Sequence, residues 1–229
     1  MKKIVMVWSF LLAAALVHAQ RAEDRTGDWL MYTGNVKLTE KFKVQSIAQL
    51  RLYELSSNLN QVVLLVSANQ KVSDHLSLGV GYGYIATETF DKEIFHNTKH
   101  ENRIFEQLIY AHQVGRMQFN HRSQLEHRWI NTYEGTSLFL NRVRYRLKLI
   151  VPINNQTLVA NTFFVSFYNE LHLNLTDMPF NQNWTYAALG YQVNKTLGLQ
   201  AGYQRQFLGA GRQLGRLQLG VSISLDVRN

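Results

Sequence analysis

The stretch "NRVRYRLKLIVP", residues 141–152, decides the fold because its charges recur at every second position. The alternating side chains are the cations Arg142, Arg144, Arg146 and Lys148 and the apolar residues Val143, Tyr145, Leu147 and Leu149. A helix would spread the four cations around its axis, whereas a strand places them on one face. The stretch therefore predicts a strand with one cationic and one apolar face.

The same period of two marks most of the chain. The other segments with strand character are 28–38, 41–54, 60–70, 75–90, 102–114, 117–130, 157–170, 183–194, 197–207 and 216–227. Alternation over ten or more residues exceeds the usual strand and suits a tilted strand that crosses a bilayer. Glu106 interrupts the apolar positions of 102–114, so a bulge or a shifted boundary is expected there. Together with residues 141–152 these segments number eleven, although bacterial membrane barrels normally have an even number of strands.

The start of the chain predicts export. Lys2 and Lys3 precede the apolar run "IVMVWSFLLAAALV", and "VHA" ends at Ala19. This layout is that of a signal peptide over residues 1–19, with a short N-terminal anchor as the alternative. Residues 20–229 contain no linker or low-complexity tract, so we expect a single domain. The chain has no cysteine, so its fold does not depend on disulfides.

The connections between the segments indicate a barrel in the outer membrane. Short connections such as "TEK" and "PINNQ" alternate with longer ones such as "SSNLN" and "DKEIFHNTKH". Short turns on one rim and long loops on the other are typical of such barrels, whose apolar residues face lipid and whose polar residues line the lumen. Aromatic residues near segment ends, among them Trp29, Trp129 and Trp184, are expected to form interfacial girdles. We therefore predict an all-β fold, an antiparallel transmembrane β-barrel of about 10–12 strands, with an exported soluble barrel of lipocalin type as the alternative.

The lumen of this barrel is predicted to be polar and rich in arginine. The expected lumenal network is Arg51, Arg103, Gln107, Arg122, Glu126, Arg128, Arg142, Arg144, Arg146 and Glu170. Charges in a narrow interior are costly unless they are paired, so Glu101, Glu126, Glu170 and Asp226 are expected partners. Two interpretations follow. The network is a rigid plug that fills the barrel, or it is the lining of an anion-preferring pore or anionic-ligand site.

The order of several motifs resembles a known family. The motifs are "W…R.YE", "ENRIFEQL", "HRSQLEHRW", "RVRYRLKL", "FYNE" and "FNQNWTYAALGYQ…LGLQAGYQRQF", spread over residues 28–226. Together they resemble the bacterial family called Domain of Unknown Function 2490. The resemblance implies an outer-membrane β-barrel of a Gram-negative, Bacteroidetes-type bacterium with no assigned activity. Beyond the network above, it carries over Glu101, Asn169, Asn183 and Gln206 as recurring polar residues. Where "QNR" is expected the chain has "QNW", so Trp184 replaces a lumenal cation.

Catalytic chemistry is the rival interpretation. His121, Ser123 and His127 share the outward face of one strand, as a lipid-modifying hydrolase would require, but no third group completes a triad. A loop holds Asp91, Glu93, His96 and His100, which could suggest a rim protease or a metal site, but a loop does not fix a coordination geometry. We therefore predict no catalytic residue, no metal and no cofactor.

The expected partners follow from an outer-membrane location. They are membrane lipid, the barrel-assembly machinery during insertion, and a small anionic solute. Nucleic acid is not expected, because export and barrel geometry account for the basic charge. The glycines of "GVGYGY", residues 79–84, lie at a strand period and precede no helix, so they do not form a phosphate loop. They are expected to leave room for lumenal arginines.

Overall fold

The computed structural model describes residues 26–90 and 98–228. This part of the chain is all-β, with eleven strands and one turn of 3-10 helix at Gly209–Gly211. The strands are β1 Gly27–Lys37, β2 Phe42–Glu54, β3 Ser57–Lys71, β4 Leu76–Thr87, β5 Lys99–Val114, β6 Met117–Asn131, β7 Ser137–Pro152, β8 Thr162–Asn174, β9 Phe180–Gln192, β10 Leu197–Leu208 and β11 Gln213–Asp226. The predicted signal peptide, residues 1–19, and the loop residues Asp91, Glu93 and His96 lie outside the described residues.

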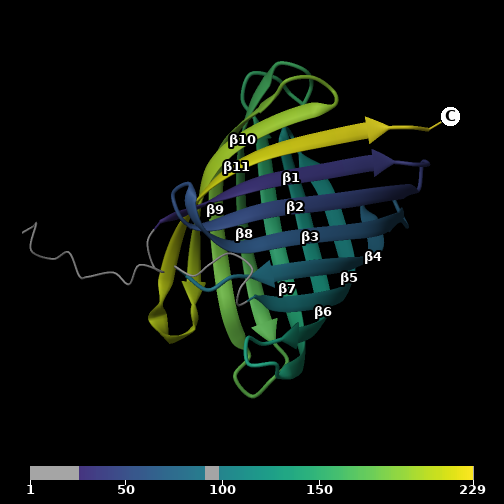
Figure 1. The fold of residues 1–229 in the computed structure, drawn as a ribbon. Coiled ribbons are helices and arrows are strands. Elements are labelled where there is room, and N and C mark those ends of the chain that lie inside the picture. Colours follow the sequence, from purple (N-terminus) through teal and green to yellow (C-terminus); the bar gives the residue numbers. More distant parts are fainter. Residues whose placement is uncertain (1–25, 91–97, 229) are drawn as a thin grey trace, which may run out of the picture.

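The eleven strands form a closed barrel in which each strand pairs with its neighbours in sequence. All of these pairs are antiparallel except the closing pair, β1 with β11, which is parallel (Figure 1). Strand count explains the exception. In an up-and-down barrel with an odd number of strands, the first and last strands run in the same direction. The prediction of about 10–12 strands is confirmed, and the prediction of a wholly antiparallel barrel is wrong at this one pair.

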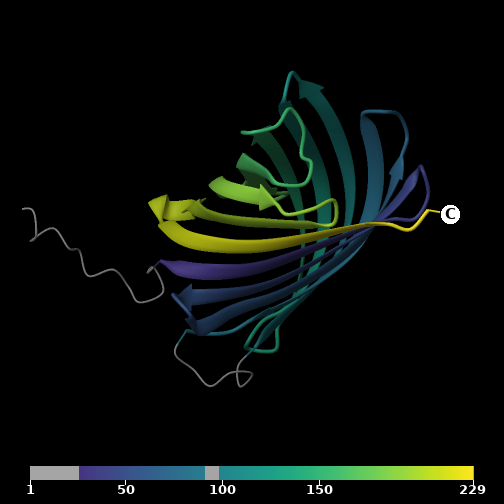
Figure 2. The same ribbon diagram turned by 90° about the horizontal axis from the view of Figure 1, so that it is seen from above.

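Alternation along each strand sorts side chains between the interior and the outer surface. In β7, Arg142 and Arg144 are buried, whereas Tyr145 and Leu147, which follow on the opposite face, are exposed. Figure 2 shows the sheet from above, curving round on itself. Large apolar side chains are exposed on the outer surface of most strands, including Leu30, Leu50, Leu64, Leu78, Ile104, Leu108, Leu147, Phe167, Leu189 and Leu219. The polar face therefore points inward and the apolar face outward, the reverse of a soluble sandwich.

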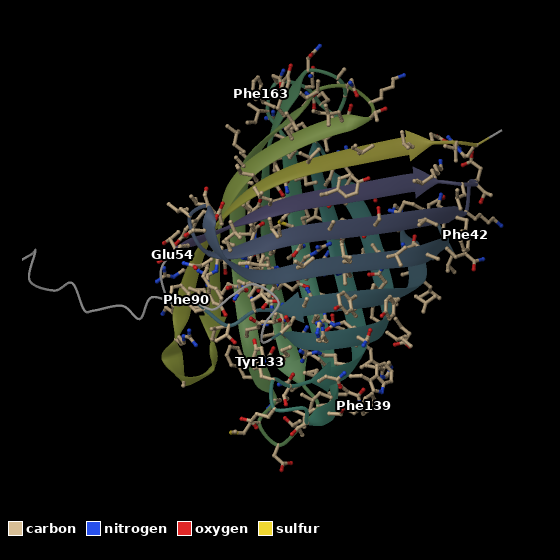
Figure 3. All side chains as sticks on the ribbon, in the orientation of Figure 1. Phe42, Glu54, Phe90, Tyr133, Phe139 and Phe163 are labelled. Carbon is tan, nitrogen blue, oxygen red and sulfur yellow. The ribbon has the colours of Figure 1, made fainter. Side chains whose placement is uncertain are left out.

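The two rims differ less in loop length than predicted. At the rim where β1 begins, here the N-terminal rim, the connections are residues 55–56, 88–98, 132–136, 175–179 and 209–212. At the opposite rim, the C-terminal rim, they are 38–41, 72–75, 115–116, 153–161 and 193–196. Figure 3 places Glu54, Phe90 and Tyr133 around the N-terminal rim, and Phe42 lies at the other end of the barrel. The expected pattern fails at one connection on each rim.

Local backbone chemistry explains both failures. The expected loop "SSNLN" is a two-residue turn, in which Ser56 takes a left-handed conformation with φ of 57°. The expected short turn "PINNQ" is the start of a longer loop, so β8 begins at Thr162 and not near residue 157. In that loop the Asn154 side chain donates to the Asn161 carbonyl at 2.9 Å and accepts from the Phe163 amide at 2.8 Å. The β-branched residues Thr157 and Val159 predict the start of a strand, but both lie in this loop.

Strand β5 contains no irregularity at Glu106. Its register with β4 and β6 is continuous, and Glu106 points outward with 55% of its side chain exposed. The expected bulge is therefore absent there. Register shifts occur instead at Arg51/Leu52 and at His172/Leu173.

The glycines of β4 accommodate neighbours other than the predicted arginines. A side chain at Gly81 would collide with the Phe105 ring, and one at Gly79 would collide with Asn69. Only Gly83 lies near an arginine, and it meets the aliphatic base of Arg103. These glycines therefore let Phe105 and Asn69 fill the interior beside β4.

Candidate functional site

The inward faces of β5 to β8 hold a connected set of charges. Five arginines and three glutamates take part, and we call them the arginine–glutamate network: Glu101 and Arg103 on β5, Arg122, Glu126 and Arg128 on β6, Arg142 and Arg144 on β7, and Glu170 on β8. Period-two spacing on adjacent antiparallel strands brings these long side chains within reach of one another.

Glu126 is the centre of the network and is fully buried. Its Oε1 accepts from Arg103 Nη1 at 2.9 Å and from Arg144 Nη1 at 2.8 Å. Its Oε2 accepts from Arg142 Nε and Nη2, each at 2.7 Å. Charge-assisted bonds of this length are the strong kind, and three arginines around one carboxylate offset the cost of burying it.

Two further carboxylates extend the network in both directions. Glu101 accepts from Arg103 at 2.6 Å and holds Arg128 with two bonds, of 2.8 and 2.9 Å. Glu170 accepts from Arg122 at 2.8 Å and from Arg144 at 2.6 Å. Arg103 and Arg144 each bridge two carboxylates, so the ion pairs form one continuous chain across four strands.

Arg51 is held differently from the other predicted arginines. It donates to Gln49 and Gln61 at 2.5–2.9 Å, and its guanidinium lies 3.9 Å from the centre of the Trp29 ring and 5.6 Å from that of Trp184. The two indole rings meet edge to face, with centroids 5.5 Å apart. This is a cation–π clamp between β1, β2 and β9, and it holds a cation without a carboxylate.

The clamp corrects the expectation for two of the three predicted girdle residues. Trp29 is 3% exposed and Trp184 is 8% exposed, and both line the interior. Both inward positions follow from alternation. Trp29 is the Cα partner of the inward Arg51, and Trp184 lies two residues from the inward Tyr186 on β9. Only Trp129 is outward, where it contacts Phe139 at 5.1 Å between ring centroids. The inward position of Trp184 is compatible with the lumenal place that the family resemblance implies for this residue.

Gln107, the uncharged member of the predicted network, lies at the edge of the arginine–glutamate network. Its Nε2 donates to Asn69 Oδ1 at 2.6 Å. It therefore links β5 to β3 through neutral groups. Of the three other residues carried over from the family, Gln206 faces inward, while Asn169 and Asn183 bond to each other on the outer surface.

Two cations among the described residues of the lumen lie outside the arginine–glutamate network. Arg146 and Lys148 on β7 make no hydrogen bond and no ion pair there, and Arg146 Nε is buried without an acceptor. In the register of the sheet, Arg146 lies between Arg122 and Glu170. It shares the charge of Glu170 with Arg122 and Arg144, which both donate to the Oε1 of that carboxylate. Lys148 lies between Asn120 and Tyr168. Positive charge is therefore left uncompensated toward the C-terminal rim.

These two cations lie where two cavities meet. One cavity of about 540 Å³ occupies the lumen, and a second of about 540 Å³ lies beside the ends of β5 and β6 at the C-terminal rim. Arg146 and Lys148 line both. A solute that enters from this rim would meet them before the arginine–glutamate network.

Sequence reasoning missed His172. This side chain of β8 is fully buried, its ring lies 4.5 Å from that of Trp184, and neither ring nitrogen has a partner. Its spacing of two residues from Glu170 was the available signal. Glu101 was expected both as a partner of the arginines and as a recurring polar residue of the family, and it closes one end of the network.

The outward histidines contact groups other than Ser123. His121 Nδ1 lies 2.8 Å from the Tyr145 hydroxyl, and Ser123 makes no hydrogen bond among the described residues. His127 lies between Asn141, at 2.7 Å, and Glu106, at 3.3 Å. His100 is not in a loop but in β5, where its ring nitrogen lies 2.7 Å from the Tyr84 hydroxyl. Residues 26–90 and 98–228 contain no group of three or more ligands that could hold a metal ion.

The comparisons with known proteins identify the family. The model of the family described as "Protein of unknown function (DUF2490)" matches residues 26–213. The chain therefore belongs to this family, and the resemblance drawn from its motifs is confirmed. No curated protein and no solved structure matches the chain. Among the described residues, no helix is long and apolar enough to cross a membrane.

Proposed function

We propose that this protein is an outer-membrane β-barrel whose lumen forms a narrow, anion-preferring passage. The exposed apolar side chains of the outer surface support a lipid environment, because an apolar exterior of this extent would be costly in water. Outer-membrane lipid and, during insertion, the barrel-assembly machinery are the corresponding partners.

The pair Arg146 and Lys148 carries the proposal. A barrel stabilised only by internal ion pairs has no need of two further cations without partners, since buried unpaired charge is unfavourable. Here the pair lines both the lumenal cavity and the cavity at the C-terminal rim. Cations in that place attract anions and repel cations, as in other selective pores.

The arginine–glutamate network favours a second candidate, a barrel that is purely structural. Its ion pairs span β5 to β8 and occupy the lumen at the level of Glu126. If these side chains seal the lumen, the barrel does not conduct. The two candidates make opposite predictions for electrical measurements.

The experiment is single-channel recording of the refolded protein in a planar bilayer under a KCl gradient. The informative variant is Arg146→Glu with Lys148→Glu, because neither side chain makes a hydrogen bond or ion pair whose loss would disturb the fold. Arg144→Glu is less suitable, because it would place a third carboxylate beside Glu126 and Glu170. The matched control is Arg205→Glu on the outer face of β10, where Arg205 binds Gln213 at 2.9 Å.

We expect discrete conductance steps and a reversal potential that indicates anion preference. The double variant should weaken or reverse that preference, and the control should leave it unchanged. A folded barrel that shows no conductance would refute the pore and favour the structural candidate. Conductance whose selectivity is the same in the double variant would show that the pair does not select anions.

A further inference from the structure

The interior contains neutral hydrogen-bonding groups that the arginine–glutamate network does not use. Gln124, Gln200 and Gln206 line the lumenal cavity and make no hydrogen bond among the described residues. Gln124 is 4% exposed, and its Oε1 has no partner. The Tyr186 hydroxyl, in a side chain that is 2% exposed, is also without a partner. Buried groups of this kind are normally satisfied by a protein group, a ligand or ordered water.

The kinds of groups define the chemistry of a fitting ligand. An amide both donates and accepts, and a phenol does the same, which matches the hydroxyl groups of a polyol. A simple inorganic anion is mainly an acceptor and has too few donors to satisfy the amide and phenol oxygens together. Tyr186 and Trp29 add ring surface to the same cavity.

The charged groups lie at one side of the same cavity. Arg146 and Lys148 are two residues apart on one face of β7, which places them about 7 Å apart along the strand. Arg122 faces Arg146 from β6, and its Nε is buried without an acceptor. Three cations around one space suit a carboxylate or a phosphate group.

We propose that the lumen binds a small anionic sugar, either a sugar acid or a sugar phosphate, with its oxyanion at Arg146 and Lys148 and its hydroxyls at the amides. A cavity of about 540 Å³ has the size of pockets that hold small molecules. The inference rests on the proposed function in one respect, that the lumen is water-filled and open from the C-terminal rim.

The test is calorimetric titration of the refolded protein with four probes: glucose 6-phosphate, glucuronate, glucose and inorganic phosphate. We expect at least one of the two anionic sugars to bind at least tenfold more tightly than both glucose and phosphate. Arg146→Gln with Lys148→Gln should weaken its binding at least tenfold. Gln124→Leu should reduce its advantage over phosphate, and Arg205→Gln on the outer face should change neither.

Other outcomes overturn the proposal. Phosphate binding as tight as that of both anionic sugars would show that the hydroxyl groups find no partners. The absence of saturable binding of either sugar to a folded barrel would remove the site altogether. Conductance distinguishes these results from failure of the proposed function. A barrel that conducts anions but binds no sugar refutes this inference alone, and one that binds sugar without conducting refutes the pore alone.

Discussion

Glu126 is the residue on which the interior depends most. Its two oxygens accept bonds from Arg103, Arg142 and Arg144, and no water reaches its side chain. A carboxamide in its place would keep one acceptor oxygen, but its NH2 group would face arginine donors, and it could not compensate three guanidinium charges. Loss of one partner from a buried ion pair typically costs about 3–5 kcal/mol.

We therefore expect Glu126→Gln to lower the free energy of unfolding by about 3–5 kcal/mol. Urea unfolding of the barrel in lipid vesicles measures the change. Glu40→Gln is the matched control, because Glu40 lies in the turn 38–41 with its side chain 77% exposed. That exposed substitution should cost less than about 1 kcal/mol. Equal effects of the two substitutions would mean that the network contributes nothing to stability.

The network could be predicted from the sequence because polar residues at period two on adjacent strands must share one face. Arg142, Arg144 and Glu126 are examples, and all three are interior. The individual pairings could not be predicted, because they depend on strand register and rotamers. The predicted interfacial position of Trp29 and Trp184 was wrong for another reason. Aromatic residues near strand ends suit both a membrane interface and a stacked cation, and only the alternation within each strand separates the two.

At the scale of elements, the closing pair of strands is the least expected feature. Leu30 of β1 and Leu219 of β11 are Cα partners on the outer surface, in parallel register. Because the chain has no cysteine, an engineered pair gives an unambiguous result. We expect Leu30→Cys with Leu219→Cys to form a disulfide on mild oxidation, since the Cα atoms of paired residues lie within bonding range.

Leu30→Cys with Leu225→Cys is the control for this crosslink. Leu225 is also outward on β11 but pairs with Val36, six residues along the strand. It should remain reduced when the first pair has oxidised. A crosslink in the control and none in the test pair would show that the barrel closes in a different register.

Strand existence was predictable at this scale, but strand boundaries and parity were not. Alternation located the most regular strands, because a one-residue slip would turn every side chain to the wrong face. Aromatic and β-branched content located others, such as those near 183–194 and 197–207. The prediction of a bulge at Glu106 assumed that an outward carboxylate needs an irregular backbone. His127 instead lies 3.3 Å from it, and the ladder continues unbroken. The end of β7 was predicted well because Pro152 cannot donate to a ladder.

For the whole molecule, the decisive question is whether the apolar outer surface meets lipid. The tryptophans provide a direct measurement, because Trp129 is outward and 44% exposed while Trp29 and Trp184 are interior. Bromine atoms on acyl chains quench only the indole rings that they contact. In vesicles of brominated lipid we therefore expect the quenched part of the fluorescence to come from Trp129.

Substitution of single tryptophans tests this assignment. Trp129→Phe should abolish most of the difference between brominated and ordinary lipid. Trp29→Phe should leave that difference unchanged, although it lowers the total signal and weakens the clamp on Arg51. Each variant is the control for the other, because Trp29 and Trp129 lie on opposite faces of the same barrel wall. Quenching that disappears with Trp29→Phe and persists with Trp129→Phe would mean that lipid reaches the polar face, and an outer-membrane barrel of this orientation would be refuted.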